Sequence, residues 1–105
     1  MKIVGRTPQG RSVVAGTYQV VETHGVPLDT VLAGLWARNA LPDWTDLMRA
    51  MCAAGRPMER TVEAVCAAVS DVGYPPEFRD AVVHWVKLVA PKLELKRAVA
   101  ERGNS

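Results

Sequence analysis

Three Gly-x-Pro tripeptides divide the chain and constrain its fold more than any other feature. A glycine can end a helix in the left-handed conformation, and a proline can open the next helix because its φ angle is already fixed. The segments between the breaks have helical length and regularly spaced apolar residues. The sequence therefore predicts a series of short helices separated at Gly25-Val26-Pro27, Gly55-Arg56-Pro57 and Gly73-Tyr74-Pro75.

Apolar residues recur at i, i+3, i+4 and i+7 in four segments, which is typical of amphipathic helices. The segment from Leu28 to Asn39 shows this pattern most clearly. The next helix is predicted to start at Asp43, with Asp46 completing an acidic version of a capping box. Two further helices follow the second and third breaks, and weaker candidates span residues 17–24 and 92–102. We therefore predict an all-α fold, a compact bundle of five to six short helices.

Residues 1–16 lack helical periodicity, and Pro8 suits a turn. They are expected to form either a flexible arm or a short β-hairpin, because an isolated hairpin is marginally stable in water. A chain of 105 residues has the length of one domain. We divide it into a basic N-terminal arm or hairpin (1–16), a helical bundle domain (17–102) and a frayed tail (103–105).

Compartment is inferred from two features of the sequence. No apolar run approaches the ~20 residues that cross a membrane, and residues 1–16 are too polar for a signal peptide. Cys52 and Cys66 would lie too far apart for a disulfide if their helices form an antiparallel hairpin turning near Gly55. We therefore expect a cytoplasmic protein with two free thiols.

Catalytic and metal-binding patterns are weak. His24, Cys52, Cys66 and His84 are spread along the chain, whereas structural zinc sites bring their ligands in close pairs. His84 follows Asp80 by one helical turn, but no nucleophile accompanies this pair. No Gly-rich phosphate loop is present. We therefore expect no catalytic residue, no cofactor and no metal site, and a protein that is not an enzyme.

The helix expected after Pro75 carries apolar residues around more than half of its circumference. Such a helix either lies at the centre of a bundle or has a second buried face, and on a small domain that face often meets a partner. We therefore expect a small intracellular interaction or adaptor protein that binds another protein or forms a homodimer. Its expected partner surface consists of Val83, Trp85, Leu88 and Leu95.

A DNA-binding regulator is the alternative function. The segment from Tyr18 to Trp36 resembles a helix-turn-helix, with two helices joined at Gly25. Its second helix lacks the hydrogen-bonding side chains that read base edges, and Asp29 would repel phosphates. Contacts to nucleic acid would then come from the basic arm and from a corner near the second break. The candidate residues are Lys2, Arg6, Arg11, Arg56 and Arg60.

Overall fold

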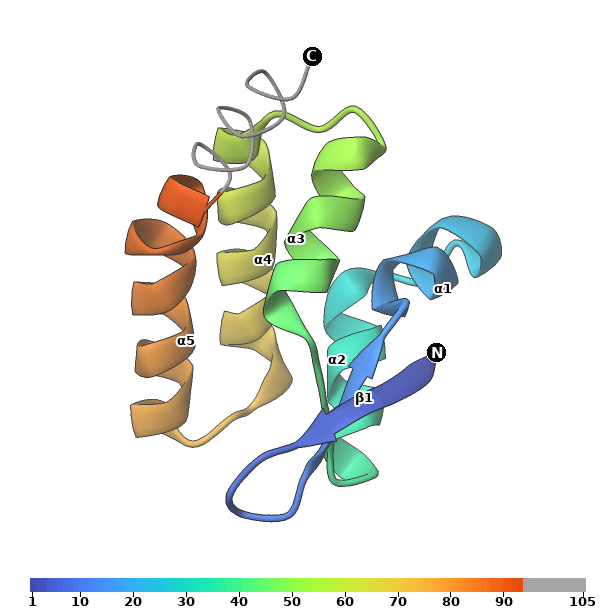
Figure 1. Ribbon diagram of the computed structural model, residues 1–105, viewed down its shortest axis with the longest axis vertical. Coiled ribbons are helices and arrows are strands. Elements are labelled where there is room, and N and C mark those ends of the chain that lie inside the picture. Colours follow the sequence, from blue (N-terminus) through green and yellow to red (C-terminus); the bar gives the residue numbers. More distant parts are fainter. Residues whose placement is uncertain (94–105) are drawn as a thin grey trace.

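The computed structural model describes residues 1–93, in which a small sheet lies beside a set of packed helices (Figure 1). The helices α3, α4 and α5 stand side by side, and the sheet lies near α2 at one end of the molecule. Along the chain the elements are β1 (Lys2–Arg6), β2 (Ser12–Ala15), α1 (Thr17–His24), α2 (Leu28–Ala37), β3 (Ala40–Pro42), α3 (Trp44–Ala53), α4 (Met58–Val72) and α5 (Pro76–Leu88).

The three Gly-x-Pro breaks separate helices as predicted. The φ angles of their glycines are 63° at Gly25, 101° at Gly55 and 88° at Gly73, all in the left-handed region that favours glycine. The proline of each break is the N-cap residue of the following helix, namely α2, α4 and α5. Each break therefore ends one helix and redirects the chain into the next within three residues.

The prediction of an all-α fold is wrong, because the described residues also form a three-stranded mixed sheet of order β1-β2-β3. β1 and β2 form an antiparallel hairpin, which is one of the two alternatives that the sequence left open for residues 1–16. β2 also pairs in parallel with β3, so that Ser12 lies beside Ala40 and Val14 beside Pro42. The hairpin is thus held by a third strand and does not stand alone.

Asn39 turns the chain from α2 into β3. Its φ angle is 60°, a conformation that asparagine tolerates better than most residues. Its carbonyl oxygen accepts a hydrogen bond from the Ser12 N–H at 3.1 Å, and its side-chain Oδ1 accepts one from Arg11 Nη1 at 2.9 Å. The Asp43 N–H donates to the Val14 carbonyl at 2.8 Å on the other side of β3. These bonds fix the short strand on β2.

Two apolar clusters hold these elements together. The smaller one lies between the sheet and α2 and consists of Val14, Val31, Leu35 and Ala40. The larger one is built around α4, which packs against α2, α3 and α5. Its fully buried side chains are Leu32, Leu47, Met51, Val65, Val69 and Val86.

Helix α5 lies at the outer edge of the bundle and packs chiefly on α4 (Figure 1). The sequence allowed two explanations for the wide apolar surface of this helix, a central position in the bundle or a second buried face. The central position is wrong, because α5 lies at the edge. Val82 and Val86 are buried against the larger cluster, whereas Leu88 is exposed. Phe78, Val83 and Trp85 are partly buried and pack against the same cluster.

Asp43 is the N-cap of α3 as predicted, and its carboxylate accepts a hydrogen bond from the Asp46 N–H at 3.1 Å. The reciprocal bond of the predicted capping box does not form. The Asp46 carboxylate instead accepts a hydrogen bond from the Gly16 N–H at 2.9 Å, and the Asp43 N–H bonds to β2. The first turn of α3 therefore anchors the connection between β2 and α1.

Candidate functional site

Four aromatic rings from four separate segments meet at the end of the bundle that adjoins the sheet. Tyr74, in the turn between α4 and α5, is the common member. Its ring centroid lies 4.9 Å from that of Trp36, 5.1 Å from that of Phe78 and 6.5 Å from that of Trp44, each in an edge-to-face arrangement. Trp36 and Phe78 also stack at 5.8 Å. Edge-to-face and stacked pairs both stabilise beyond the area that they bury, so the cluster joins α2, α3 and α5 firmly.

Arg11 covers the outer side of this cluster. The Arg11 guanidinium carbon lies 3.7 Å from the centroid of the Trp36 ring, within the range of a cation–π interaction. The same guanidinium donates to Asn39 Oδ1. Arg11, which the sequence suggested as a phosphate ligand, therefore attaches the hairpin to α2.

Tyr74 is the most unusual polar group in the described part of the chain. Its side chain is 4% exposed, and its hydroxyl group has no hydrogen-bond partner among residues 1–93. Burial raises the pKa of the Tyr74 hydroxyl, and the positive charge of Arg11 opposes this effect only in part. Tyr74 consequently stays neutral and acts as an apolar ring.

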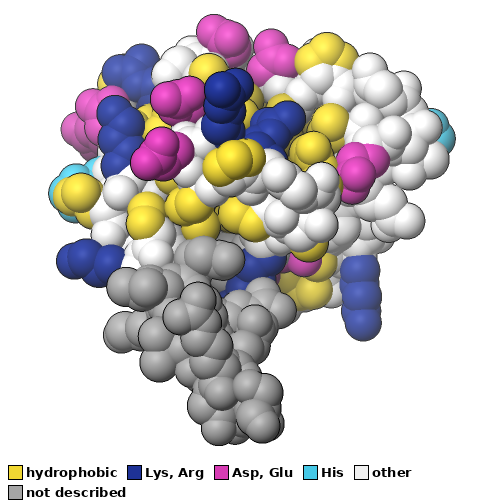
Figure 2. Space-filling view, turned by 90° about the horizontal axis from the view of Figure 1, so that it is seen from above, with side chains coloured by type: hydrophobic (Ala, Val, Ile, Leu, Met, Phe, Trp, Pro, Cys, Tyr) yellow, Lys and Arg dark blue, Asp and Glu magenta, His cyan; other side chains and the backbone are white. Residues whose placement is uncertain are grey.

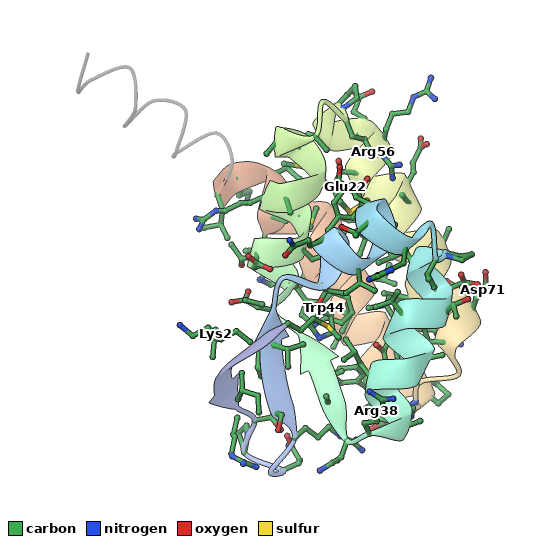
Figure 3. All side chains as sticks on the ribbon, turned by 90° about the vertical axis from the view of Figure 1, so that its right-hand side faces the viewer. Lys2, Glu22, Arg38, Trp44, Arg56 and Asp71 are labelled. Carbon is green, nitrogen blue, oxygen red and sulfur yellow. The ribbon has the colours of Figure 1, made fainter. Side chains whose placement is uncertain are left out.

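An open groove of about 410 Å³ lies on the far side of the aromatic cluster. One wall comes from the hairpin and β3, another from the first turn of α3, and the third from α5. Trp44 lies at the point where the sheet meets the helices (Figure 3). The lining is mostly apolar and consists of Thr7, Val13, Leu41, Pro42, Asp43, Trp44, Thr45, Phe78 and Trp85.

A second, smaller hollow of about 20 Å³ shares Trp85 and Thr45 with the groove. Its other lining residues are Met48, Arg49, Met58, Ala90 and Leu93. Trp85 therefore lines both hollows, and a large aromatic side chain in such a position is typical of interface residues with large energetic contributions.

The predicted partner surface is divided by the structure. Trp85 is half-buried in the groove wall, and Leu88, one turn further along α5, is 53% exposed. Val83 and Trp85 both pack against the larger core cluster, but Val83 does not line the groove. Leu95 lies outside the described residues. Helix α5 thus brings Trp85 and Leu88 together on one side and leaves Val83 on the other.

The predicted nucleic-acid contacts lie in two distant places. Lys2 and Arg6 are exposed on β1, whereas Arg56 lies in the turn between α3 and α4 and Arg60 in the first turn of α4. Figure 3 shows Lys2 and Arg56 well apart, with Arg56 at the end of the molecule away from the hairpin. Figure 2, which shows the end that carries this turn, has Lys and Arg side chains intermingled with Asp and Glu. The structure therefore does not join the two basic sets into one surface.

Helix α2 also lacks the surface that the recognition helix of a helix-turn-helix presents to DNA. Its Leu32 side chain, which that arrangement would turn toward DNA, is fully buried. The exposed positions of α2 carry only small side chains or none, at Thr30, Ala33, Gly34 and Ala37. Since α2 packs along α4, it is a core helix and does not present a recognition surface.

Sequence reasoning missed the sheet side of the groove. Adjacent residues of a strand point to opposite faces, so Val13 faces the groove while Val14 is buried against α2. Leu41, the neighbour of Val13 on β3, lies on the same face. The signal in the sequence was the pair of adjacent valines, because a strand covered on both faces has no apolar–polar alternation.

The described residues show neither a metal site nor a membrane-spanning helix. Residues 1–93 contain no cluster of three or more His, Cys, Asp or Glu side chains that could hold a metal ion. None of the helices in this range has the length and apolar character required to cross a membrane. Cys52 and Cys66 are free, and burial raises the pKa of the Cys66 thiol despite the nearby charge of Lys87.

Comparison with models of protein families, with curated proteins and with solved structures found no significant match for the chain.

Proposed function

We propose that the protein is a small, non-enzymatic interaction module that binds an apolar segment of a partner protein in the groove between the sheet, α3 and α5. The observation that carries the proposal is the groove itself, about 410 Å³ in volume and walled by Trp44, Phe78 and Trp85. Aromatic residues contribute most of the binding energy at many protein interfaces. A volume of this size is also within the range that encloses a ligand group.

The position of α5 supports this function. A helix at the edge of a bundle needs only one apolar face, yet α5 also carries Trp85 and Leu88 outside its fully buried stripe, and its C-cap residue Val89 is 37% exposed. A partner segment lying along α5 would cover these side chains together. Trp85 lines the groove itself, and Leu88 is exposed about one turn further along the same helix, so the two side chains favour a contact surface that extends from the groove along α5.

The polar groups of the groove suggest how a partner is oriented. Asp43 and Thr45 lie at the start of α3, beside the indole of Trp44. The Asp43 carboxylate already caps α3, but each carboxylate oxygen can accept more than one hydrogen bond. A backbone N–H of the partner could therefore bond there while an apolar side chain fills the space between Trp44 and Trp85.

The partner is either a different protein or a second copy of this chain. We place the interaction in the cytoplasm, in keeping with the two free cysteines, because thiols stay reduced there whereas disulfides form in secreted proteins. A homodimer would join two α5 surfaces around a twofold axis, whereas a different partner would leave the protein monomeric in isolation.

The test is a selection of the protein against a library of short random peptides, followed by titration of a selected peptide. Two variants target the groove. Trp85→Ala removes its central wall, and Thr45→Arg fills it from a half-buried position without removing an apolar core side chain. Thr30→Arg, at an exposed position of α2, is the matched control.

Both groove variants should weaken peptide binding by about tenfold or more, as expected for a central interface residue, while Thr30→Arg binds like the wild type. Sedimentation equilibrium of the wild type and Thr45→Arg decides whether a second copy is the partner. Two results together would show that the groove is not the interaction site. Thr45→Arg and Thr30→Arg would bind the selected peptide equally well, and Thr45→Arg would sediment like the wild type.

A further inference from the structure

Strand β1 is an open edge of the sheet. Of the strands in the described residues only β2 pairs with it, and all five of its residues are exposed. An edge strand directs about half of its backbone N–H and C=O groups away from its neighbour, where another extended chain can pair with them. Ile3 and Val4 are 59% and 50% exposed, so apolar side chains accompany these free backbone groups.

A bulge in β1 determines where its two charges point. Lys2 pairs with Ala15 and Arg6 with Ser12, and the register shifts between Ile3 and Gly5. Ala15 and Ser12 are three residues apart on β2, so they lie on opposite faces of the sheet. Lys2 and Arg6 therefore also lie on opposite faces, one at each end of β1.

Both charges are free within the described part of the chain. The ion pair found among residues 1–93 joins Arg79 and Asp80, and neither Lys2 nor Arg6 forms one there. Figure 3 shows the Lys2 side chain projecting away from the body of the molecule. The edge thus offers a positive group on each face, with apolar side chains between them.

We infer that β1 binds an extended acidic segment of another protein by strand addition, independently of the groove. The partner would form a fourth strand beside β1. Carboxylates on its two faces would lie opposite Lys2 and Arg6, and β-branched residues between them would pack against Ile3 and Val4.

The charge pattern favours an acidic partner over a second copy of this chain. β1 carries Lys2 and Arg6 and no acidic residue, so pairing of β1 with itself would bring four positive side chains together and give none of them an opposite charge. Opposite-charge pairs stabilise neighbouring strands and like charges destabilise them. An acidic partner supplies an opposite charge for both Lys2 and Arg6.

The strand is short, so the interaction should be weak and rapidly exchanging. Five residues of β1 provide much less area than a standard protein interface. Strand addition gains affinity from backbone hydrogen bonds and selectivity from the side chains that face the edge. The charges of a peptide should therefore determine its selectivity for β1. Its backbone hydrogen bonds should be required for any binding to β1.

The experiment uses labelled peptides and fluorescence anisotropy with the full chain. The probe is a peptide with the core Thr-Glu-Val-Ile-Glu-Thr, in which the two Glu are three residues apart like the β2 partners of Lys2 and Arg6, and its counterpart has Lys in place of both Glu. Two further versions of the acidic peptide are N-methylated at alternate residues, one set on each edge of the extended chain. The protein variants are Lys2→Glu with Arg6→Glu, and a control that reverses two exposed charges elsewhere, Arg60→Glu with Lys87→Glu.

The acidic peptide should bind the wild type about tenfold more tightly than the basic one, from two cross-strand charge pairs. Reversal of Lys2 and Arg6 should invert this preference, whereas the control variant should keep it. One N-methylated peptide should lose binding and the other retain it, because alternate N–H groups of a strand point to opposite edges.

Three results would overturn the inference. The first is the absence of acidic-peptide binding at millimolar concentration, and the second is equal binding of both N-methylated peptides. The third is binding of the wild type to phosphatidylserine vesicles, lost on reversal of Lys2 and Arg6, without peptide binding. That result would assign the edge to an anionic membrane surface instead.

Discussion

Replacing Tyr74 with Phe should stabilise the protein, although the residue is buried in its aromatic cluster. The substitution keeps the ring that meets Trp36 and Phe78 edge to face and removes only the hydroxyl oxygen. That oxygen has no hydrogen-bond partner among residues 1–93, whereas it bonds to water in the unfolded chain. A buried group without a partner costs about 1–3 kcal/mol, so a gain of about 1 kcal/mol in the free energy of unfolding is expected at pH 7.

The gain should increase at alkaline pH. An unfolded tyrosine loses its proton near pH 10, whereas burial raises the pKa of Tyr74 in the folded protein. The folded state then binds more protons than the unfolded state, and stability falls as pH rises through this region. With the folded group still neutral, the wild type should lose about 1.4 kcal/mol by about pH 11 through this residue alone. The Phe variant has no such loss.

Urea unfolding followed by tryptophan fluorescence measures both effects. The free-energy difference between Tyr74→Phe and wild type should rise from about 1 kcal/mol at pH 7 to about 2.4 kcal/mol at pH 11. Tyr18→Phe is the matched control, because the Tyr18 hydroxyl is not among the buried atoms without a partner. Titration of lysines and other groups is common to all three proteins and cancels in the differences.

Two outcomes would refute this reasoning. A loss of stability in Tyr74→Phe at pH 7 would mean that the hydroxyl has a favourable partner in solution, such as a buried water molecule. A difference that does not grow between the two pH values would mean that Tyr74 ionises in the folded state as easily as in the unfolded chain.

Further predictions concern single residues of the fold and the two surfaces. Asn39→Ala should cost about 1–2 kcal/mol by urea unfolding, because it loses the bond to Arg11 and strains a left-handed position, and Asn39→Gly should cost less. Asp43→Ala should cost about 1 kcal/mol in the same assay through loss of the α3 cap. Leu88→Asp should leave stability within about 0.5 kcal/mol, so that any association lost in sedimentation is a surface effect. A random DNA duplex should show no steeply salt-dependent anisotropy between about 50 and about 200 mM salt, since the basic residues form no joint surface.

The helices could be predicted from the sequence because each carries its own signals. Glycines at positive φ and prolines at the following N-caps delimit α2, α4 and α5, and the spacing of apolar residues fixes which face is buried. These signals are local and do not depend on a distant partner. The predicted first residues of α1 and α2, Thr17 and Leu28, match the structure for this reason.

The sheet could not be predicted in the same way. β3 has only three residues, Ala40 to Pro42, which is too short for alternation to be visible. Its conformation depends on Asn39 and on hydrogen bonds to a strand almost thirty residues earlier in the chain. The groove depends on this sheet, so its sheet-side wall was missed while Trp85, on a helix with local signals, was found.

The basic residues of the hairpin show why charge alone is a weak guide to function. Arg11 carries the same charge as Lys2 and Arg6 and lies in the same segment, yet its guanidinium is held by the Trp36 ring and by Asn39. Moving it to a phosphate would break both contacts and loosen the attachment of the hairpin to α2. Lys2 and Arg6 have no such contacts in the described residues, so a ligand can use them without cost to the fold. A binding partner of the hairpin is therefore expected at the edge of β1 and not at its turn.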